Sequence, residues 1–141
     1  MSLDHIMGIA GTALNAQLTR MNATASNLAN AGTTATTEAE AYRPKRTVFK
    51  SLLDEQMTHP GANYVGGVKV HQVVDDPLPP RLVYDPNNPL SNDEGFVYQS
   101  NVSEVAEMVD MMAAARSYQN NVEVINTARQ LMMRTLDITK A

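Results

Sequence analysis

The residues of this chain that could bind a metal ion are few and scattered. The three histidines, His5, His59 and His71, are far apart, none has a partner four residues away, and the chain contains no cysteine. Protein zinc sites draw on clustered histidine and cysteine ligands. The sequence therefore predicts no metal site.

The carboxylates that could serve as a general acid and base occur as two adjacent pairs, Asp75-Asp76 and Asp93-Glu94. Neighbouring residues on a strand point to opposite faces and cannot share one substrate, and both pairs flank turn residues. The chain also lacks a Gly-rich phosphate loop and a nucleophile elbow. We therefore expect no catalytic residues, no cofactor and no enzymatic activity.

The charge balance argues against two further classes of function. The chain has 11 Lys and Arg against 15 Asp and Glu, a net charge of -4. Its one small basic cluster, within residues 43–50, is typical of a solvated strand or turn, so we expect no binding to nucleic acid. Apolar runs such as residues 111–115 are too short to span a bilayer. Residues 2–5 lack the basic start of a secretory signal peptide, so neither membrane insertion nor a cleaved signal is expected.

A seven-residue apolar repeat predicts a long helix at the N-terminus, over residues 3–31. Its large apolar members are Met7, Leu14, Leu18, Met21 and Leu28. This is the spacing of a helix that lies along another helix. Gly32 is a plausible C-terminal cap, and the helix would be about 40 Å long.

A second long helix is predicted at the C-terminus, over residues 101–138. Asn101 followed by Glu104 resembles a capping box, and Glu107 and Asp110 place negative charge near the helix start, where the helix dipole favours it. No proline or glycine interrupts residues 102–138. The helix would be about 55 Å long.

The apolar stripe of this second helix is wider than one partner helix can cover. Its central members are Met108, Met111, Ala115, Tyr118, Val122, Ile125, Ala128 and Met132. A flanking set widens it: Val105, Val109, Met112, Val124 and Leu131. The width favours packing against other subunits as well as within the chain.

The middle of the chain, residues 32–100, contains all seven prolines and several β-like runs. The predicted strands are 47–49, 68–74, 81–84 and 95–98, with a strong turn signal at 85–89. We therefore predict one α+β subunit over residues 1–141, in which two long terminal α-helices form a coiled-coil-like pair and a small β-rich insert lies between them.

Several stretches resemble the bacterial flagellar axial proteins, and among these the proximal-rod subunits. They are ASNLANAGT at 25–33, YRPK at 42–45, GGVKV at 66–70, LVYDPNNPL at 82–90, EMVDMMAAARSYQNNVEVINTARQLM at 107–132 and RTL at 134–136. The resemblance covers nearly the whole chain. It implies a structural subunit of the proximal rod of the flagellar basal body, the shaft that transmits torque for motility.

The resemblance also implies partners and a location. Such subunits pass through the flagellar type III export apparatus without a cleaved signal peptide and polymerise through their terminal helices into a rod that spans the periplasm. The implied partners are copies of the chain, neighbouring rod proteins, and the basal-body ring and adaptor at the rod base.

In such a rod, the uncharged stretch at residues 26–37 would be an interface, with Asn27 and Asn30 bonding to neighbouring subunits. The predicted assembly residues are Met7, Leu14, Leu18, Met21, Asn27, Leu28, Asn30, Met108, Met111, Ala115, Tyr118, Val122, Ile125 and Met132. An alternative function is a helical-hairpin adaptor or export chaperone that binds partner proteins. A metal-dependent enzyme would need convergent ligands, which the sequence lacks.

Overall fold

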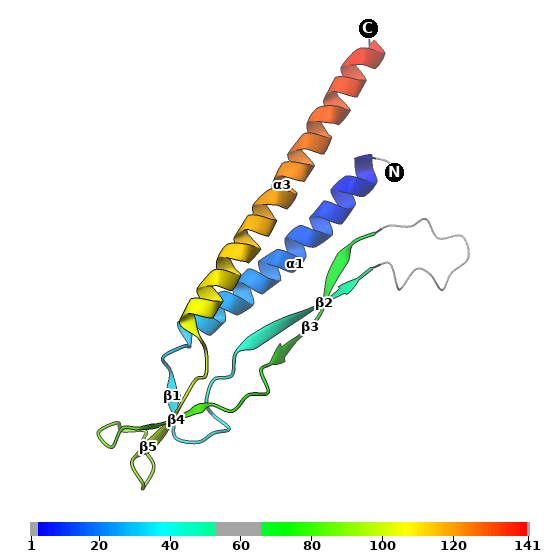
Figure 1. Cartoon of the computed structure of the whole chain (residues 1–141). Helices are drawn as coiled ribbons and strands as arrows, with labels where there is room; N and C mark the ends of the chain where they lie inside the picture. The colour runs from blue at the N-terminus through cyan, green and yellow to red at the C-terminus, as the bar shows by residue number, and fades with distance from the viewer. Residues whose placement is uncertain (1–2, 53–65, 141) are drawn as a thin grey trace, which may run out of the picture. The chain divides into compact units, whose positions relative to one another are not determined.

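The computed structural model describes residues 3–52 and 66–140, the last two by their backbone only. Along the chain, a small region of antiparallel sheet separates two long helices, α1 and α3 (Figure 1), which confirms the predicted α+β class. In chain order the elements are α1 (Leu3–Ala29), β1 (Thr34–Ala35), β2 (Lys45–Ser51), β3 (Val68–Asp75), β4 (Arg81–Tyr84), β5 (Phe96–Gln99) and α3 (Glu104–Lys140).

Helix α1 ends two residues earlier than predicted and without the expected glycine cap. The Ala31 N–H donates to the Leu28 carbonyl at 3.3 Å and the Thr33 N–H to the Asn30 carbonyl at 3.2 Å, so the chain leaves the helix through tight turns. Among the described residues only Gly95 has a positive φ. The assignment of Gly32 as a left-handed cap is therefore wrong, because these turns already satisfy the last carbonyls.

Helix α3 begins at Glu104, three residues later than predicted. Its first turn is closed by a bond from the Glu107 N–H to the Ser103 carbonyl at 3.0 Å. The Asn101 side chain instead donates to the Leu78 carbonyl at 3.1 Å. The predicted capping box at Asn101 is therefore wrong, because its amide is bonded to a loop before the helix starts.

The three-stranded sheet has the order β1-β5-β4. Strands β4 and β5 are antiparallel, with Leu82 opposite Tyr98 and Tyr84 opposite Phe96. Both lie where the sequence predicted strands, and the predicted turn between them contains a bond from the Asn88 N–H to the Asp85 carbonyl at 3.2 Å. The short strand β1 was not predicted. Its two residues pair with Tyr98 and Gln99 of β5.

Strands β2 and β3 form a separate two-stranded sheet. At one end the Asp76 N–H donates to the Pro44 carbonyl at 2.8 Å, and at the other the Leu52 N–H donates to the Gly67 carbonyl at 3.0 Å. The residue numbers rise along one strand as they fall along the other, so the pair is antiparallel.

The chain divides into two compact units, and each long helix contributes to both. Unit 1 contains the chain up to residue 19, residues 48–72 and the chain from residue 113; unit 2 contains residues 20–47 and 73–112. The most buried helix residues of unit 1 are small: Ala10, Ala16, Ala114 and Ala128. Those of unit 2 are polar: Thr24, Asn27 and Glu107. No helix among the described residues has an apolar stretch long enough to cross a membrane.

Candidate functional site: a buried polar joint and an exposed helix face

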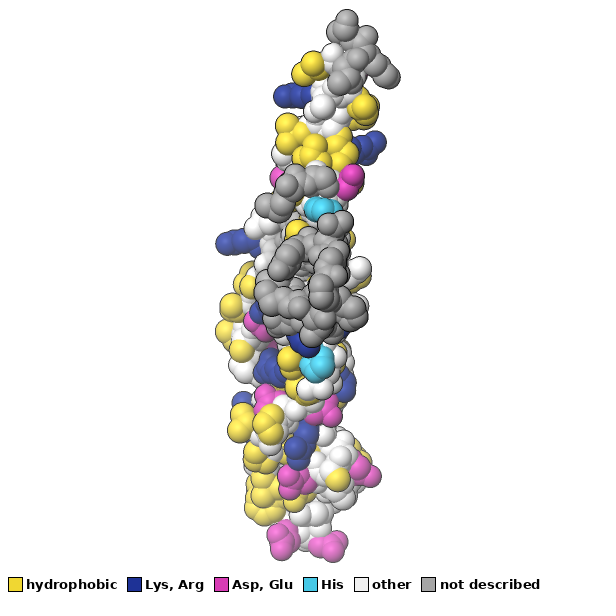
Figure 2. Space-filling model, turned by 90° about the vertical axis from the view of Figure 1, so that its right-hand side faces the viewer, with side chains coloured by type: hydrophobic (Ala, Val, Ile, Leu, Met, Phe, Trp, Pro, Cys, Tyr) yellow, Lys and Arg dark blue, Asp and Glu magenta, His cyan; other side chains and the backbone are white. Residues whose placement is uncertain are grey.

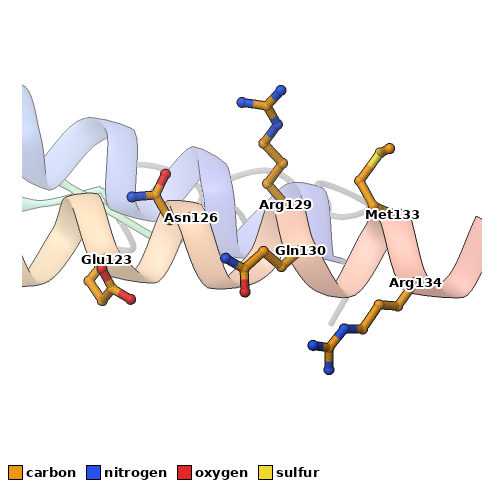
Figure 3. Close-up of a pocket in the computed structure, with 6 residues that line it drawn as sticks. All are labelled: Glu123, Asn126, Arg129, Gln130, Met133 and Arg134. Atoms are coloured by element: carbon orange, nitrogen blue, oxygen red, sulfur yellow. The ribbon is translucent and has the colours of Figure 1, made fainter.

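Two hollows of the described surface do not resemble an active site. One, with a volume of about 490 Å³, is lined by six residues of α3 alone. Figure 3 shows Arg129 and Met133 on one side of the helix and Glu123 and Arg134 on the other, so these side chains do not converge on a ligand. Within residues 3–52 and 66–140 no three His, Cys, Asp or Glu side chains are grouped to hold a metal ion. His59 lies outside the described residues.

A second hollow in unit 1 is an apolar groove between the two helices. Its volume is about 250 Å³, and Leu3 and Ile6 of α1 face Val124, Ala128 and Leu131 of α3 across it. Leu131 and Val124 are half-exposed there. Such a groove suits an apolar side chain from a packing partner better than a polar substrate.

In unit 2, the strongest polar arrangement is centred on the side-chain amide of Asn27, which is wholly buried. Its oxygen accepts from the Lys45 N–H at 2.7 Å and from the Tyr42 hydroxyl at 3.0 Å. Its nitrogen donates to the Lys45 carbonyl at 3.0 Å and to a Glu107 carboxylate oxygen at 2.9 Å. Asn27 thus makes four hydrogen bonds, which exhausts the usual capacity of an amide.

The carboxylate of Glu107 is the second centre of this arrangement. Its side chain is 1% exposed, and its other oxygen accepts from the Arg46 guanidinium at 2.6 Å. The same guanidinium reaches Asp76 at 3.5 Å. A buried carboxylate is tolerated where it is paired with a cation and hydrogen-bonded, and both conditions hold here. We call Asn27, Tyr42, Lys45, Arg46, Asp76 and Glu107 the polar joint.

A more exposed ion pair lies next to the polar joint. Arg20 of α1 contacts Asp110 of α3 at 2.7 Å, with 29% and 41% of the two side chains exposed. In Figure 1 the C-terminal part of α1 and the start of α3 lie side by side, as these contacts require. Partly exposed pairs of this kind contribute about 1 kcal/mol or less.

Three of the four cations in the basic cluster of residues 43–50 are paired with acids. Arg43 contacts Glu38 at 3.3 Å and Lys45 contacts Asp75 at 3.2 Å. Together with the Arg46 contacts, these pairs neutralise the start of β2. A surface for nucleic acid would instead present several unpaired cations on one face.

The predicted assembly residues fall into three groups. Leu18 and Met108 are exposed, whereas Asn27 is fully buried and satisfied within the chain. The remaining residues are partly covered by their own chain: Met7, Leu14, Met21, Leu28, Asn30, Met111, Ala115, Tyr118, Val122, Ile125 and Met132. The Asn30 amide donates to the Ser26 carbonyl of its own helix at 2.8 Å. The Asn27 amide is therefore satisfied within the subunit, whereas the role of Asn30 at an interface stays a prediction.

The flanking set of apolar residues on α3 is exposed throughout, as expected for a stripe wider than one partner. At the start of the helix the exposed fractions are 74% for Val105, 56% for Met108, 55% for Val109 and 62% for Met112. Further along α3, exposed apolar side chains continue with Val124, Leu131, Met133, Leu136 and Ile138. Figure 2 shows yellow apolar side chains at the surface toward the C-terminal end of α3, interspersed with dark-blue basic ones. We call the four exposed residues at the start of the helix, Val105, Met108, Val109 and Met112, the exposed α3 face.

The sequence indicated the exposed α3 face but not the polar joint. Glu107 was interpreted as a charge favoured by the helix dipole, although it precedes Ala114 by seven residues and so shares its buried side of the helix. The feature of the sequence that could have indicated the buried carboxylate is a charged residue on an apolar side of the helix. Its partners could not be identified, because Asn27 and Arg46 lie 80 and 61 residues away.

Comparison with known proteins places the chain among flagellar rod components. Residues 7–35 match the family model described as flagella basal body rod protein, and residues 93–138 match that of the flagellar basal body rod FlgEFG protein C-terminal region. The flagellar basal-body rod protein FlgC of Yersinia enterocolitica is 46% identical over 138 residues, which cover 98% of each chain. The protein of that name in Bacillus subtilis is 37% identical over 151 aligned positions, covering 99% of this chain and all of the relative.

Proposed function

Because the chain belongs to the family of the flagellar basal-body rod protein FlgC, we propose that it builds the proximal rod by polymerising through its terminal helices. It is a structural subunit of the flagellar basal-body rod and not an enzyme. The single observation that carries the proposed mode of assembly is the exposed α3 face, an apolar surface that water alone would cover in an isolated subunit.

Within the subunit, α1 and α3 are proposed to pair in a coiled-coil-like manner. The Arg20–Asp110 and Asn27–Glu107 contacts join the helices in unit 2, and the apolar groove has residues of both helices on its walls in unit 1. Ala10, Ala16, Ala114 and Ala128, all buried, are small enough for close helix approach. The larger residues of the seven-residue repeat would then flank this seam and remain partly available to a neighbour.

Between subunits, the exposed α3 face is proposed to meet helices of adjacent rod proteins. Val105, Met108, Val109 and Met112 follow the i, i+3, i+4, i+7 spacing of one helix face. Methionine adapts to partners of different shape, which suits a subunit with both its own copies and other rod proteins as neighbours. The predicted assembly residues Leu18 and Met108 are exposed in the subunit and available for this contact.

The location of the rod and the export route of its subunits are proposed from the family alone. The rod would span the periplasm as the torque-transmitting drive shaft, attached to the basal-body ring and its adaptor. Subunits would reach it through the flagellar type III export apparatus without a cleaved signal peptide.

Replacing Met112 by aspartate tests the assembly proposal. Its side chain is 62% exposed, so Met112→Asp should leave the melting temperature of the purified subunit within about 2 °C. In the rod, the same carboxylate would be buried without a partner. We therefore expect bacteria in which Met112→Asp replaces the unaltered protein to lose swimming. Basal bodies isolated from these bacteria should lack the subunit.

The matched control is Asn120→Asp, which adds the same charge at an exposed polar position of α3. It should leave swimming and incorporation near the level of the unaltered protein. Normal swimming by Met112→Asp, or an equal loss in both variants, would contradict the role given to the exposed α3 face. An adaptor or chaperone, the alternative function, would be absent from purified basal bodies even when unaltered.

A further inference from the structure

The polar joint connects segments that are far apart in the chain. Asn27 is near the end of α1, Lys45 and Arg46 begin β2, and Glu107 is in the first turns of α3. Their contacts are short, at 2.6 Å between Arg46 and Glu107 and 2.7 Å between the Lys45 N–H and Asn27. All of these residues belong to unit 2.

Glu107 differs from the other charged members because its carboxylate is fully buried, and its two oxygens bond to two different segments. One oxygen takes the Asn27 amide of α1 and the other takes the Arg46 guanidinium of β2. If either segment were displaced, a charged oxygen at 1% exposure would lose its donor. Unpaired buried charges are among the most costly defects in a folded protein.

The start of α3 can therefore dock without leaving the Glu107 carboxylate unpaired only when α1 and β2 are already in contact through Asn27. Coupling free energies are reciprocal, so the seated α3 must stabilise the α1–β2 contact by the same factor. We propose that Glu107 is a positioning residue that makes the docking of α1, β2 and α3 a single cooperative event. This proposal concerns the isolated subunit and does not depend on rod assembly.

Amide hydrogen exchange of the purified full-length chain tests the proposal. Glutamine at position 107 keeps the size of the side chain but turns an NH₂ group toward one of the two donors. For Glu107→Gln we expect exchange of residues 45–47 and 26–29 to be at least tenfold faster, although both segments are at least 60 residues away in sequence. Faster exchange confined to α3 would overturn the proposal, as would an unaltered protein without protection at 45–47.

Asp110→Asn is the matched control, because it removes the same charge three residues along the helix from a half-exposed pair with Arg20. It should change exchange at 45–47 by less than about threefold, since exposed pairs are weakly coupled. If Asp110→Asn accelerated exchange as much as Glu107→Gln does, the acceleration would be a general consequence of removing a charge. That result would contradict the specific role of Glu107.

A double variant separates coupling from simple destabilisation. In Arg46→Gln with Glu107→Gln, two amides can pair where a carboxylate and guanidinium stood. We expect slower exchange at 26–29 than in Glu107→Gln alone, even if that single variant loses protection throughout unit 2. Additive acceleration by the two substitutions would mean that they act independently, and the proposal would fail.

Discussion

At the scale of single residues, the choice of an uncharged amide at position 27 is explained by its surroundings. The amide is fully buried and bonds to two backbone groups of Lys45, the Tyr42 hydroxyl and the Glu107 carboxylate. An amide can donate and accept at once, which neither a carboxylate nor an ammonium group can do. The sequence indicated a specific role for Asn27, but it placed the partners of this amide in other subunits, because partners between 15 and 80 residues away in the chain could not be assigned.

Replacing Asn27 by leucine should destabilise the subunit strongly. The change leaves the Lys45 N–H and carbonyl and one Glu107 oxygen without the partner they have in Asn27, while the Tyr42 hydroxyl keeps its bond to Ser26. We expect a loss of about 2–4 kcal/mol in the free energy of unfolding, measured by urea denaturation. Asn30→Leu, whose side chain bonds to its own helix, should cost about 1 kcal/mol or less. Equal losses in the two variants would contradict the central position given to Asn27.

At the scale of elements, the helices and most strands could be predicted because they follow from local patterns. The apolar repeat and the absence of proline define α1 and α3, and the turn residues at 85–89 separate β4 from β5. The ends of the helices were less predictable, since Asn101 can cap a helix or bond to a loop, and the Leu78 carbonyl that it bonds is 23 residues away. Strand β1 has two residues and carries no periodicity of its own.

Gly95 is the residue on which the geometry of the β4–β5 connection depends. Its φ is +81°, and a Cβ there would lie 3.0 Å from a Tyr84 ring carbon and 3.3 Å from Pro86 Cβ. Gly95→Ala should therefore lower the free energy of unfolding by about 1–2 kcal/mol, measured by urea denaturation. It should also disturb the edge-to-face packing of Tyr84 on Phe96, whose rings are 5.2 Å apart.

Gly32→Ala provides the comparison for this substitution. Its position has no neighbouring atom within 4 Å of an added Cβ and no positive φ. Its effect on the free energy of unfolding should stay within about 0.5 kcal/mol. A Gly95→Ala variant as stable as Gly32→Ala would contradict the strain assigned to Gly95.

At the scale of the whole molecule, one side of α3 is covered by its own chain and the other is exposed to water. Ala114 and Ala128 are buried and Met111, Tyr118, Val122 and Ile125 are partly covered, whereas Val105, Val109 and Met112 face water. The sequence predicted the total width of this apolar surface from periodicity. It could not divide the surface between the subunit and its neighbours, because that division depends on the path of α1 and of the insert.

Substitutions of Ile125 and Glu123 test which side of the C-terminal half of α3 packs within the subunit. Ile125 is partly covered within its own chain and Glu123 is exposed. Ile125→Asp places a carboxylate on the covered side, and we expect it to lower the free energy of unfolding by about 2–4 kcal/mol through lost apolar burial and desolvation of the charge. Swimming should be lost as well, because the same side of the helix must be intact in every copy of a rod.

The comparison between variants distinguishes the covered side of α3 from its exposed face. Glu123→Ala should preserve both the free energy of unfolding and swimming, since a solvated side chain contributes little. Met112→Asp should preserve stability while abolishing swimming, whereas Ile125→Asp should impair both. If Ile125→Asp swims normally, or if Glu123→Ala loses as much as Ile125→Asp, the covered side does not position α3 for assembly. The pair of measurements on each variant, urea denaturation of the purified chain and motility of the cell, therefore separates folding of the subunit from its incorporation.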